Sequence, residues 1–283
     1  MIEKMLDRMR KHIQIFGLIH FIFSLSKYVL IRPFSILLFI LMKKIALMSG
    51  PLFIYKILGF NVALMPPPRK KIMSELFKKS FKEKNKPLKF LEVGTWFGEG
   101  STQLWIDLLP KKSELYLVDA WGKYISSDDS TDFMYQLVST YNIGFQASHN
   151  VLKKLCHYEA NKNHIDINFL RGKSTSLLKN FKEDTFDLIY IDASHYYKEV
   201  KADILAAKNI VNKKFSIICG DDLDMGINPE LVKLAKLNLH KNYSDGFHPG
   251  VLLAVHENFK KVNEKDGFWW VYCIDGKYTD IYR

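Results

Sequence analysis

The feature that most constrains the fold is a regular alternation of short apolar runs with helix-forming stretches through residues 85–283. Strands that pair in parallel need a long crossover between them, and a helix is the usual crossover. The chain then ends in two apolar runs joined by Asp275-Gly276, a typical signal for an antiparallel hairpin. We therefore predict an α/β fold with a doubly wound, mostly parallel, seven-stranded sheet. The expected strands are 88–93, 115–119, 165–170, 186–192, 215–219, 268–274 and 277–282, and the expected helices are 101–109, 196–211 and 251–259.

A stretch of prolines marks a boundary before this pattern. Met65-Pro66-Pro67-Pro68 is stiff and cannot continue a helix, so the chain is expected to divide there. At 283 residues, the chain is long enough for one α/β domain and an additional module, but two full domains would be crowded. The predicted parts are an apolar helical segment at 1–64, a linker with a lead-in helix at 65–84 and the main domain at 85–283.

Inside the main domain, residues 120–164 form an excursion that is longer than a simple connection between elements. Helical patterns occur in it near residues 131–141 and 147–160. Long segments in compact domains are usually functional, so we expect this excursion to carry substrate contacts.

The N-terminal segment, residues 1–64, carries most of the net positive charge of the chain. It has nine Lys or Arg residues against two acidic ones, in a chain whose formal net charge is +11. Its uncharged apolar stretches fall short of the roughly 20 residues of a spanning helix. We interpret it as a segment that lies on an anionic membrane surface. Packing on the main domain or on a second subunit is the alternative, and a cleaved signal peptide is a weaker one. Because its basic residues are embedded among Phe, Ile and Leu, nucleic-acid binding is not expected.

The composition is that of a folded protein, with 48% hydrophobic and 14% aromatic residues. Cys156, Cys219 and Cys273 are widely spaced and lack CxxC pairing, which argues for a reducing compartment and against zinc. We interpret them as buried thiols. The expected location is the cytoplasm, with peripheral attachment to the inner face of the membrane if the N-terminal segment binds there.

A glycine-containing loop follows the first expected strand, with the sequence Glu92-Val93-Gly94-Thr95-Trp96-Phe97-Gly98-Glu99-Gly100-Ser101. Glycine lets a backbone turn sharply and approach a ligand, and a helix N-terminus offers N–H donors. The spacing Gly-x-x-x-Gly-x-Gly differs from the Gly-x-Gly-x-x-Gly of dinucleotide-binding loops, and Glu99 would repel a phosphate. Carboxylates here suit the positive amino and sulfonium groups of S-adenosylmethionine (SAM). The predicted cofactor-binding residues of this loop are Glu92, Gly94, Thr95, Gly98 and Ser101.

The predicted cofactor site also includes residues at or after the ends of the second and third expected strands. Asp119 ends the second strand, where an acid can accept hydrogen bonds from ribose hydroxyls in both NAD- and SAM-binding sheets. Trp121 and Ser174 are candidate adenine contacts. The structural alternatives are that Asp119 caps a turn and that Trp121 fills the core.

Five motifs occur in an order that is typical of one enzyme family: LEVGTWFGEGST, LYLVDAW, FLRGKS, FDLIYIDASHYYKEVKADI and IICGDD. In these motifs, residues 85–283 resemble the class I SAM-dependent methyltransferases, which have a Rossmann-like fold. Within that class, the chain looks most similar to the bacterial group whose fourth strand ends in Ile-Asp-x-x-His-x-Tyr, related to the macrolide-sugar O-methyltransferases. The resemblance implies SAM as cofactor and an acceptor hydroxyl on a sugar, glycan or glycosylated metabolite. It does not cover residues 1–64.

Three carboxylates are expected at one edge of the sheet, Asp192 after the fourth strand and Asp221-Asp222 after the fifth. Without a cationic partner in the sequence, such a cluster is costly unless a positive ion neutralises it. Oxygen ligands favour Mg²⁺, followed by Mn²⁺ and Ca²⁺. The predicted metal ligands are therefore Asp192, Asp221 and Asp222, with Asp224 as a substitute. Similarity to metal-dependent O-methyltransferases, including the catechol type, implies the same three-position site.

The predicted catalytic residues are His195 and Asp192, and Asp192 is also predicted to bind the cofactor. The catechol enzymes have a lysine base three residues beyond the first metal-binding aspartate, and His195 occupies that position here. A histidine of near-neutral pKa can accept a hydroxyl proton. The structural alternatives are that Asp192 caps a helix, His195 bonds to backbone and Asp222 is solvated. His248-Pro249-Gly250 is a candidate part of the acceptor pocket, whereas His240, His248 and His256 are interpreted as surface or core residues and not as a cluster of their own.

These observations favour a SAM-dependent O-methyltransferase, assisted by a divalent metal, with a small-molecule or glycan acceptor and no nucleic-acid partner. A homo-oligomer is compatible with the sequence. Two other functions stay open. An NAD-dependent oxidoreductase is disfavoured by the loop spacing and by acids that hydride transfer does not need. A non-catalytic, membrane-associated scaffold is permitted because fold does not determine function.

Overall fold

The computed structural model describes residues 65–81, 86–121, 151, 164–239 and 246–282, all in the second of two units of the chain, Pro51–Arg283. The predicted membrane-surface segment and the helix near 131–141 lie outside the described residues, as does the helix near 147–160 except for residue 151. Within the described ranges, no helix has the length and apolar character needed to cross a membrane.

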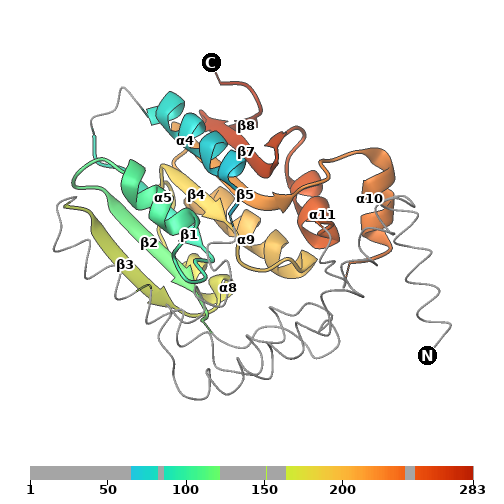
Figure 1. The fold of residues 1–283 in the computed structure, drawn as a ribbon, viewed down its shortest axis with the longest axis horizontal. Helices are drawn as coiled ribbons and strands as arrows, with labels where there is room; N and C mark the ends of the chain where they lie inside the picture. The colour runs from blue at the N-terminus through green and yellow to red at the C-terminus, as the bar shows by residue number, and fades with distance from the viewer. Residues whose placement is uncertain (1–64, 82–85, 122–150, 152–163, 240–245, 283) are drawn as a thin grey trace. The chain divides into compact units, whose positions relative to one another are not determined.

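The main domain is built on one eight-stranded sheet (Figure 1). Its strands are β1 (Lys89–Val93), β2 (Glu114–Asp119), β3 (Asp166–Arg171), β4 (Leu188–Ile191), β5 (Phe215–Leu223), β6 (Asn263–Lys265), β7 (Gly267–Ile274) and β8 (Lys277–Thr279). They lie in the order β3-β2-β1-β4-β5-β7-β6, and β8 also pairs with β7. β1 to β5 pair in parallel, whereas β7 runs antiparallel to β5. The predicted doubly wound, mostly parallel sheet is confirmed.

The seventh position of the sheet is shared by two short strands. β6 pairs with residues 268–270 of β7, and β8 pairs with residues 272–274. β6 was not predicted, because its sequence Asn-Glu-Lys has no apolar alternation. The predicted hairpin between β7 and β8 is confirmed. Its turn residues Asp275 and Gly276 have φ angles of 48° and 74°, the positive values that a type I′ turn requires.

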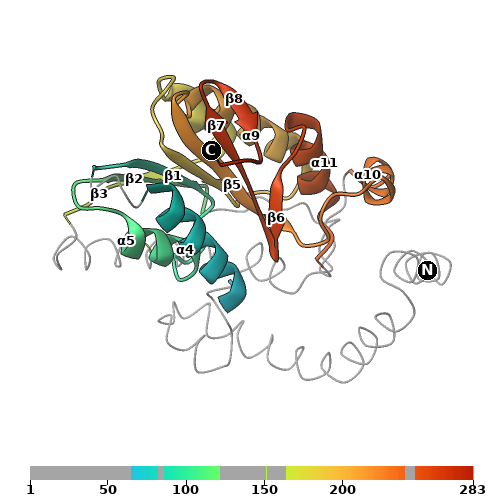
Figure 2. The same ribbon diagram turned by 90° about the horizontal axis from the view of Figure 1, so that it is seen from above.

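Helices cover both faces of this sheet (Figures 1 and 2). One face carries α4 (Pro67–Phe81) and α5 (Ser101–Leu108), and the other carries α9 (Tyr197–Ile210) and α11 (Pro249–Asn258). The remaining helices are α8 (Ser174–Leu177), the 3₁₀ turn η2 (Leu178–Asn180) and α10 (Pro229–Lys236), which packs on α11. Strands between two helical layers are apolar on both sides. β4, with the sequence Leu-Ile-Tyr-Ile, is buried along its whole length.

Helix α4 begins inside the proline stretch. Pro67 and Pro68 occupy its first turn, where the missing N–H is not needed and the fixed φ suits a helix. The prediction that no helix continues through this stretch is compatible with a helix that begins at its second proline. The buried face of α4 includes Phe77, whose ring lies 6.3 Å from that of Trp105 on α5. This packing fixes the position of Arg69, a buried residue in the first turn of α4, relative to the sheet.

Strand β5 extends beyond its predicted end at residue 219 and includes Asp221 and Asp222. Its pairing with β7 is interrupted between Gly220 and Leu223, where Asp222 has a φ of 67°. Such a bulge leaves a residue unpaired and changes the direction of its side chain. Asp222 is therefore turned out of the ladder at the carboxyl end of the sheet.

Candidate active site

A cavity of about 330 Å³ opens at the carboxyl ends of β1, β2 and β4. Ligands of doubly wound sheets bind at this edge. Its wall includes five residues that the sequence predicted for the site: Gly94, Asp119, Trp121, Ser174 and Asp192. The structure thus brings together residues from four separate motifs.

Gly94 places the loop after β1 directly against the end of β4. Its φ is +89°, and a Cβ at this position would lie 2.0 Å from the carbonyl oxygen of Asp192. Only glycine suits both the backbone conformation and the space. Gly98 has a φ of 68°, and its N–H donates to the carbonyl of Thr95 at 2.8 Å, which closes the turn. The sharp turn expected from the glycine spacing is confirmed.

Asp119 holds two loops together at the cavity wall. Its Oδ2 accepts hydrogen bonds from the N–H groups of Thr95 (2.9 Å) and Trp96 (3.1 Å), and its Oδ1 accepts one from Trp121 (2.7 Å). Burial raises the pKa of Asp119, and these backbone hydrogen bonds oppose the rise. The carboxylate is therefore both a turn cap and part of the cavity surface.

Two tryptophans line one side of the cavity. Trp121 stacks on Phe169 of β3 with ring centroids 4.1 Å apart, and its Nε1–H donates to the carbonyl of Trp96 at 3.1 Å. Because Trp121 is only 3% exposed, it also contributes to the core. Trp96 has a positive φ of 49°. Sequence reasoning did not single it out, although its place inside the glycine loop was a signal.

Glu92 and Ser101 lie behind the glycine loop and not among the residues that line the cavity. The Ser101 hydroxyl donates to Oε1 of Glu92 at 2.5 Å, and Glu92 is completely buried. Burial raises the pKa of Glu92 to about 8, against the opposing effect of the hydrogen bond from Ser101. This pair supports the loop from the side of the core.

Ser174 lies at the start of α8 and is oriented by α9. Its hydroxyl donates to Oδ2 of Asp203 at 3.0 Å. Asp203 is 1% exposed, and burial raises its pKa to about 7. Asp203 was not predicted as a site neighbour, because nothing in the helical pattern around it distinguishes it.

Asp192 connects the cavity with the carboxylates at the end of β5. The Tyr190 hydroxyl donates to Oδ2 of Asp192 at 3.0 Å and lies 3.5 Å from Oδ2 of Asp221. Burial, followed by the negative charges of Asp222 and Asp221, raises the pKa of Asp192. The carboxylates therefore lie near one another, as predicted from their positions after the fourth and fifth expected strands.

Arg69 is a cationic partner of this cluster that the sequence did not reveal. Its Nη1 lies 2.6 Å from Oδ1 of Asp221, and its Nη2 lies 2.5 Å from Oδ1 of Asp224. Its Nε–H donates to the carbonyl of Asp266 at 2.7 Å. The premise that the acids have no cationic partner is wrong, because α4 brings Arg69 from 155 residues before Asp224.

The predicted three-carboxylate magnesium site does not fit this arrangement. Asp221 already pairs with a guanidinium, which would repel a metal ion from the same carboxylate. Within the described part of the chain, the group whose ligand atoms all lie within 4.8 Å of one another is His195, Asp222 and His248. Of the three predicted ligands, only Asp222 belongs to that group, so no step of the reaction is assigned to Mg²⁺ at Asp192 and Asp221.

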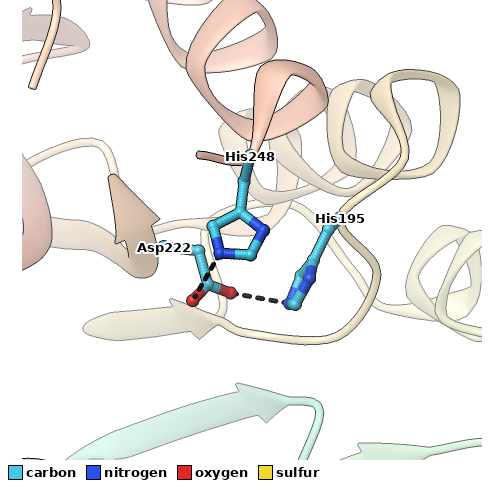
Figure 3. A group of neighbouring side chains, drawn as sticks. All are labelled: His195, Asp222 and His248. Atoms are coloured by element: carbon cyan, nitrogen blue, oxygen red, sulfur yellow. Dashed lines mark ion pairs between the residues drawn. The ribbon is translucent and has the colours of Figure 1, made fainter. Parts of the chain in front are cut away.

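His195, Asp222 and His248 converge from the loop after β4, the end of β5 and the start of α11 (Figure 3). Nε2 of His195 lies 2.7 Å from Oδ2 of Asp222, and Nε2 of His248 lies 3.7 Å from Oδ1. Burial lowers the pKa of His248 to about 4. Burial alone would raise the pKa of Asp222, but the two imidazoles lower it below its usual value. Asp222 is thus paired, and not simply solvated.

Gly250 explains how His248 reaches His195. A Cβ at Gly250 would lie 2.3 Å from the carbonyl oxygen of His195 and 2.5 Å from the nitrogen of Tyr197. The N-terminus of α11 can therefore touch the backbone of the loop after β4 only with glycine here. Sequence reasoning placed His248-Pro249-Gly250 near the acceptor but did not group His248 with His195. His-Pro-Gly before an apolar helix was the available signal.

Part of the chain matches a known family of domains, and the fold is similar to that of solved structures. Residues 91–223 match the family model of a methyltransferase domain. The chain is similar to the solved structure of an O-methyltransferase from Bacillus cereus in complex with SAH, with 13% identity, coverage of 79% of this chain and 88% of that one, and a TM-score of 0.47. It is also similar to a protein from Corynebacterium glutamicum, with 11% identity, coverage of 78% and 86%, and a TM-score of 0.47. No curated protein matches the chain.

The family match begins within β1 and ends with β5, so it includes the glycine loop, Asp119, Asp192 and the acids of β5. Two of the three cysteines, Cys219 and Cys273, are buried and unbridged, as predicted, while Cys156 lies outside the described residues. The match disfavours the NAD-dependent alternative, because a methyltransferase domain covers the loop that the two cofactors would share. With its Rossmann-like sheet and its cavity at the carboxyl edge, the chain contains a SAM-dependent methyltransferase domain, matched over residues 91–223.

Proposed function

We propose that this enzyme transfers the methyl group of SAM to a hydroxyl of a small-molecule acceptor, in the class of sugars, glycans and glycosylated metabolites. One observation carries the proposal. The loop at residues 192–196 borders the cavity through Ala193, Ser194 and Tyr196, while His195 is directed at Asp222. A methyl donor in the cavity and a hydroxyl beside His195 would meet at this loop. Methyl transfer needs such close placement of the two reactants.

The cofactor roles follow from the contacts of the cavity wall. Gly94 leaves room for the cofactor beside the end of β4, and Asp119 offers carboxylate oxygens to the ribose hydroxyls. Trp121 and Ser174 are the proposed adenine contacts. The other predicted cofactor residues, Glu92, Thr95, Gly98 and Ser101, keep the loop in its shape.

The acceptor hydroxyl has to lose its proton as the new O–CH₃ bond forms. SAM supplies the methyl group and leaves as SAH. His195, oriented by the carboxylate of Asp222, is placed to take the proton, which is the role predicted from the sequence. Asp192, at the border between the cavity and the cluster, is the proposed second catalytic residue and positions the acceptor.

The acceptor class rests on the resemblance to the macrolide-sugar O-methyltransferases. A membrane-linked glycan would also suit the predicted contact of residues 1–64 with the inner face of a membrane. A non-catalytic scaffold would not need a cavity whose wall contains the predicted cofactor residues.

Calorimetric titration of the full chain with SAM, and separately with NAD⁺, tests the cofactor part of the proposal. We expect micromolar SAM binding, no NAD⁺ binding, and a loss of at least about 10-fold in SAM affinity for Asp119→Asn, because the ribose loses a charged acceptor. The matched control is Asp166→Asn, at the exposed start of β3. NAD⁺ binding without SAM binding would overturn the proposal.

A screen of hydroxylated acceptors with isotopically labelled SAM tests the transfer itself. The expected product carries one methyl group on an oxygen, identified by mass spectrometry and by its resistance to re-methylation. Methylation of nitrogen or carbon acceptors in place of hydroxyls would contradict the proposed acceptor chemistry while leaving the methyltransferase activity intact.

A further inference from the structure

We propose that His195, Asp222 and His248 form a binding site for a divalent transition-metal ion of the Zn²⁺, Co²⁺ and Ni²⁺ class. The inference deepens the proposed function, because the ion would lie where the acceptor hydroxyl is expected. Its catalytic purpose therefore rests on that function, whereas the binding itself can be tested without an acceptor.

The three side chains already stand at distances that a bound ion requires. One ligand atom from each of them lies within 4.8 Å of the other two, and the rings of the two histidines are 4.5 Å apart. Figure 3 shows both imidazoles directed toward the carboxylate of Asp222. Small side-chain rotations would bring two nitrogens and one oxygen to the roughly 2.0 to 2.2 Å typical of zinc ligands.

The donor set selects the class of ion. Imidazole nitrogen suits Zn²⁺, Cu²⁺, Ni²⁺ and Fe²⁺, whereas Mg²⁺ and Ca²⁺ prefer sites made only of oxygen ligands. Two histidines and one carboxylate also leave coordination positions open, which is typical of catalytic and not of structural sites. The side chains of His195, Asp222 and His248 are 17%, 19% and 11% exposed, so the site is sheltered but reachable.

The surrounding charge favours a cation at this position. Four carboxyl groups gather here, at Asp192, Asp221, Asp222 and Asp224, and Arg69 pairs with Asp221 and Asp224. Asp222 is left to face the two imidazoles. A divalent ion held by Asp222 would offset the excess of negative charge without competing for the oxygens that Arg69 occupies.

The backbone holds the three ligands in place before any ion binds. Asp222 occupies the bulge of β5 with a φ of 67°, an unusual conformation for a residue other than glycine, and such conformations cluster at functional sites. Close contact at Gly250 fixes His248 beside the loop that carries His195. A preformed site loses little conformational freedom on binding an ion.

Ion binding would change the role of His195 from proton acceptor to ligand. A divalent ion next to an acceptor hydroxyl lowers the pKa of that hydroxyl, and the released proton passes to solvent. The oxygen then attacks the methyl carbon, the bond between that carbon and sulfur breaks, and SAH leaves. The proposed ion is therefore bound by two imidazole nitrogens and one carboxylate oxygen, and not by the three carboxylates that were predicted to bind magnesium.

Metal binding is measured on the full chain, purified without a histidine tag and treated with a chelator. Co²⁺ is the probe, because its visible d–d absorption reports coordination and the near-ultraviolet band of a cobalt–thiolate bond would reveal a cysteine ligand. We compare wild type with His248→Gln and His195→Gln. The matched control is His256→Gln, an exposed histidine on α11, the helix that His248 immediately precedes. The same four proteins are also titrated with Mg²⁺ and with SAM by calorimetry.

We expect one Co²⁺ per chain, no thiolate band, and affinity at least about 100-fold lower in either ligand variant than in wild type and His256→Gln. Mg²⁺ should bind far more weakly, and all four proteins should still bind SAM, which shows that they are folded. Equal Co²⁺ binding by all four proteins, or none, would overturn the metal site while leaving the methyltransferase function standing. Mg²⁺ binding that survives both histidine substitutions would also overturn it and return the site to the carboxylates.

Discussion

At the residue scale, Glu92 was predicted as a cofactor contact, but its burial gives it a structural role. Its carboxylate was expected to face the positive groups of SAM, but the structure buries it behind the glycine loop and bonds it to Ser101. A carboxylate without a cationic partner is costly in such a place, and Oε2 of Glu92 has no hydrogen-bond partner. Glu92 therefore supports the loop and does not line the cavity.

Glu92→Gln should remove a pH dependence of stability. Burial raises the folded-state pKa of Glu92 to about 8, whereas the unfolded chain has the ordinary value near 4.5. Between these pH values the folded state binds more protons than the unfolded state, so the stability of the wild type falls as pH rises and levels off above pH 8. Glutamine cannot ionise. We expect the free energy of unfolding of the wild type, relative to Glu92→Gln, to fall by a few kcal/mol from pH 5 to pH 9.

Urea denaturation at several pH values measures this difference, and Glu183→Gln, an exposed acid whose removal should leave the slope unchanged, is the control. A constant difference between wild type and Glu92→Gln across this range would show that Glu92 is ionised in the folded protein.

At the element scale, helix α4 does more than lead into the sheet. It packs on α5 through Phe77 and Trp105, and its first turn carries Arg69 to Asp221 and Asp224 at the end of β5.

The strands and helices themselves were predicted closely, because their apolar periods are local properties of the sequence. β6 and α10 were missed because short polar or amphipathic segments depend on neighbours for their structure.

Arg69→Met should destabilise the fold much more than a substitution elsewhere on α4. Removing one partner of a buried ion pair leaves uncompensated carboxylates, which costs about 3 to 5 kcal/mol. Lys71→Met is the control, because Lys71 is 78% exposed and pairs only weakly with Glu75 at 4.0 Å, so its removal should change stability by less than about 0.5 kcal/mol. Equilibrium unfolding in urea measures both. Equal effects of the two substitutions would mean that Arg69 is not needed to hold the carboxylates.

At the scale of the whole molecule, the N-terminal segment has to be explained by its charge and hydropathy. Nine of the basic residues lie in residues 1–64, together with most of the long apolar stretches. Basic residues among apolar ones suit the interface of an anionic membrane. A methyltransferase attached there would meet acceptors that are themselves linked to the membrane.

The full chain should bind vesicles that contain anionic phospholipid and bind neutral vesicles much less. Substituting Lys43 and Lys44 by Gln should weaken binding roughly 30-fold, since each basic residue near such a surface contributes about 1 kcal/mol. Co-sedimentation measures the affinity, with Lys260 and Lys261 substituted in the same way as a control. Binding that is equal for both vesicle types would contradict an electrostatic contribution, and no binding at all would favour packing of the segment on protein.

The sequence by itself determined where most strands occur along the chain, the position of the motifs at strand ends and the enzyme class, because apolar periods and motif spacing are local properties of the sequence. Only the tertiary structure decided which side chains meet. Arg69 pairs with Asp221 and Asp224, Asp203 orients Ser174, and His248 joins His195 beside Asp222. These contacts join residues that are distant in sequence, and they depend on helix packing and on close approach at glycine, which no local pattern encodes.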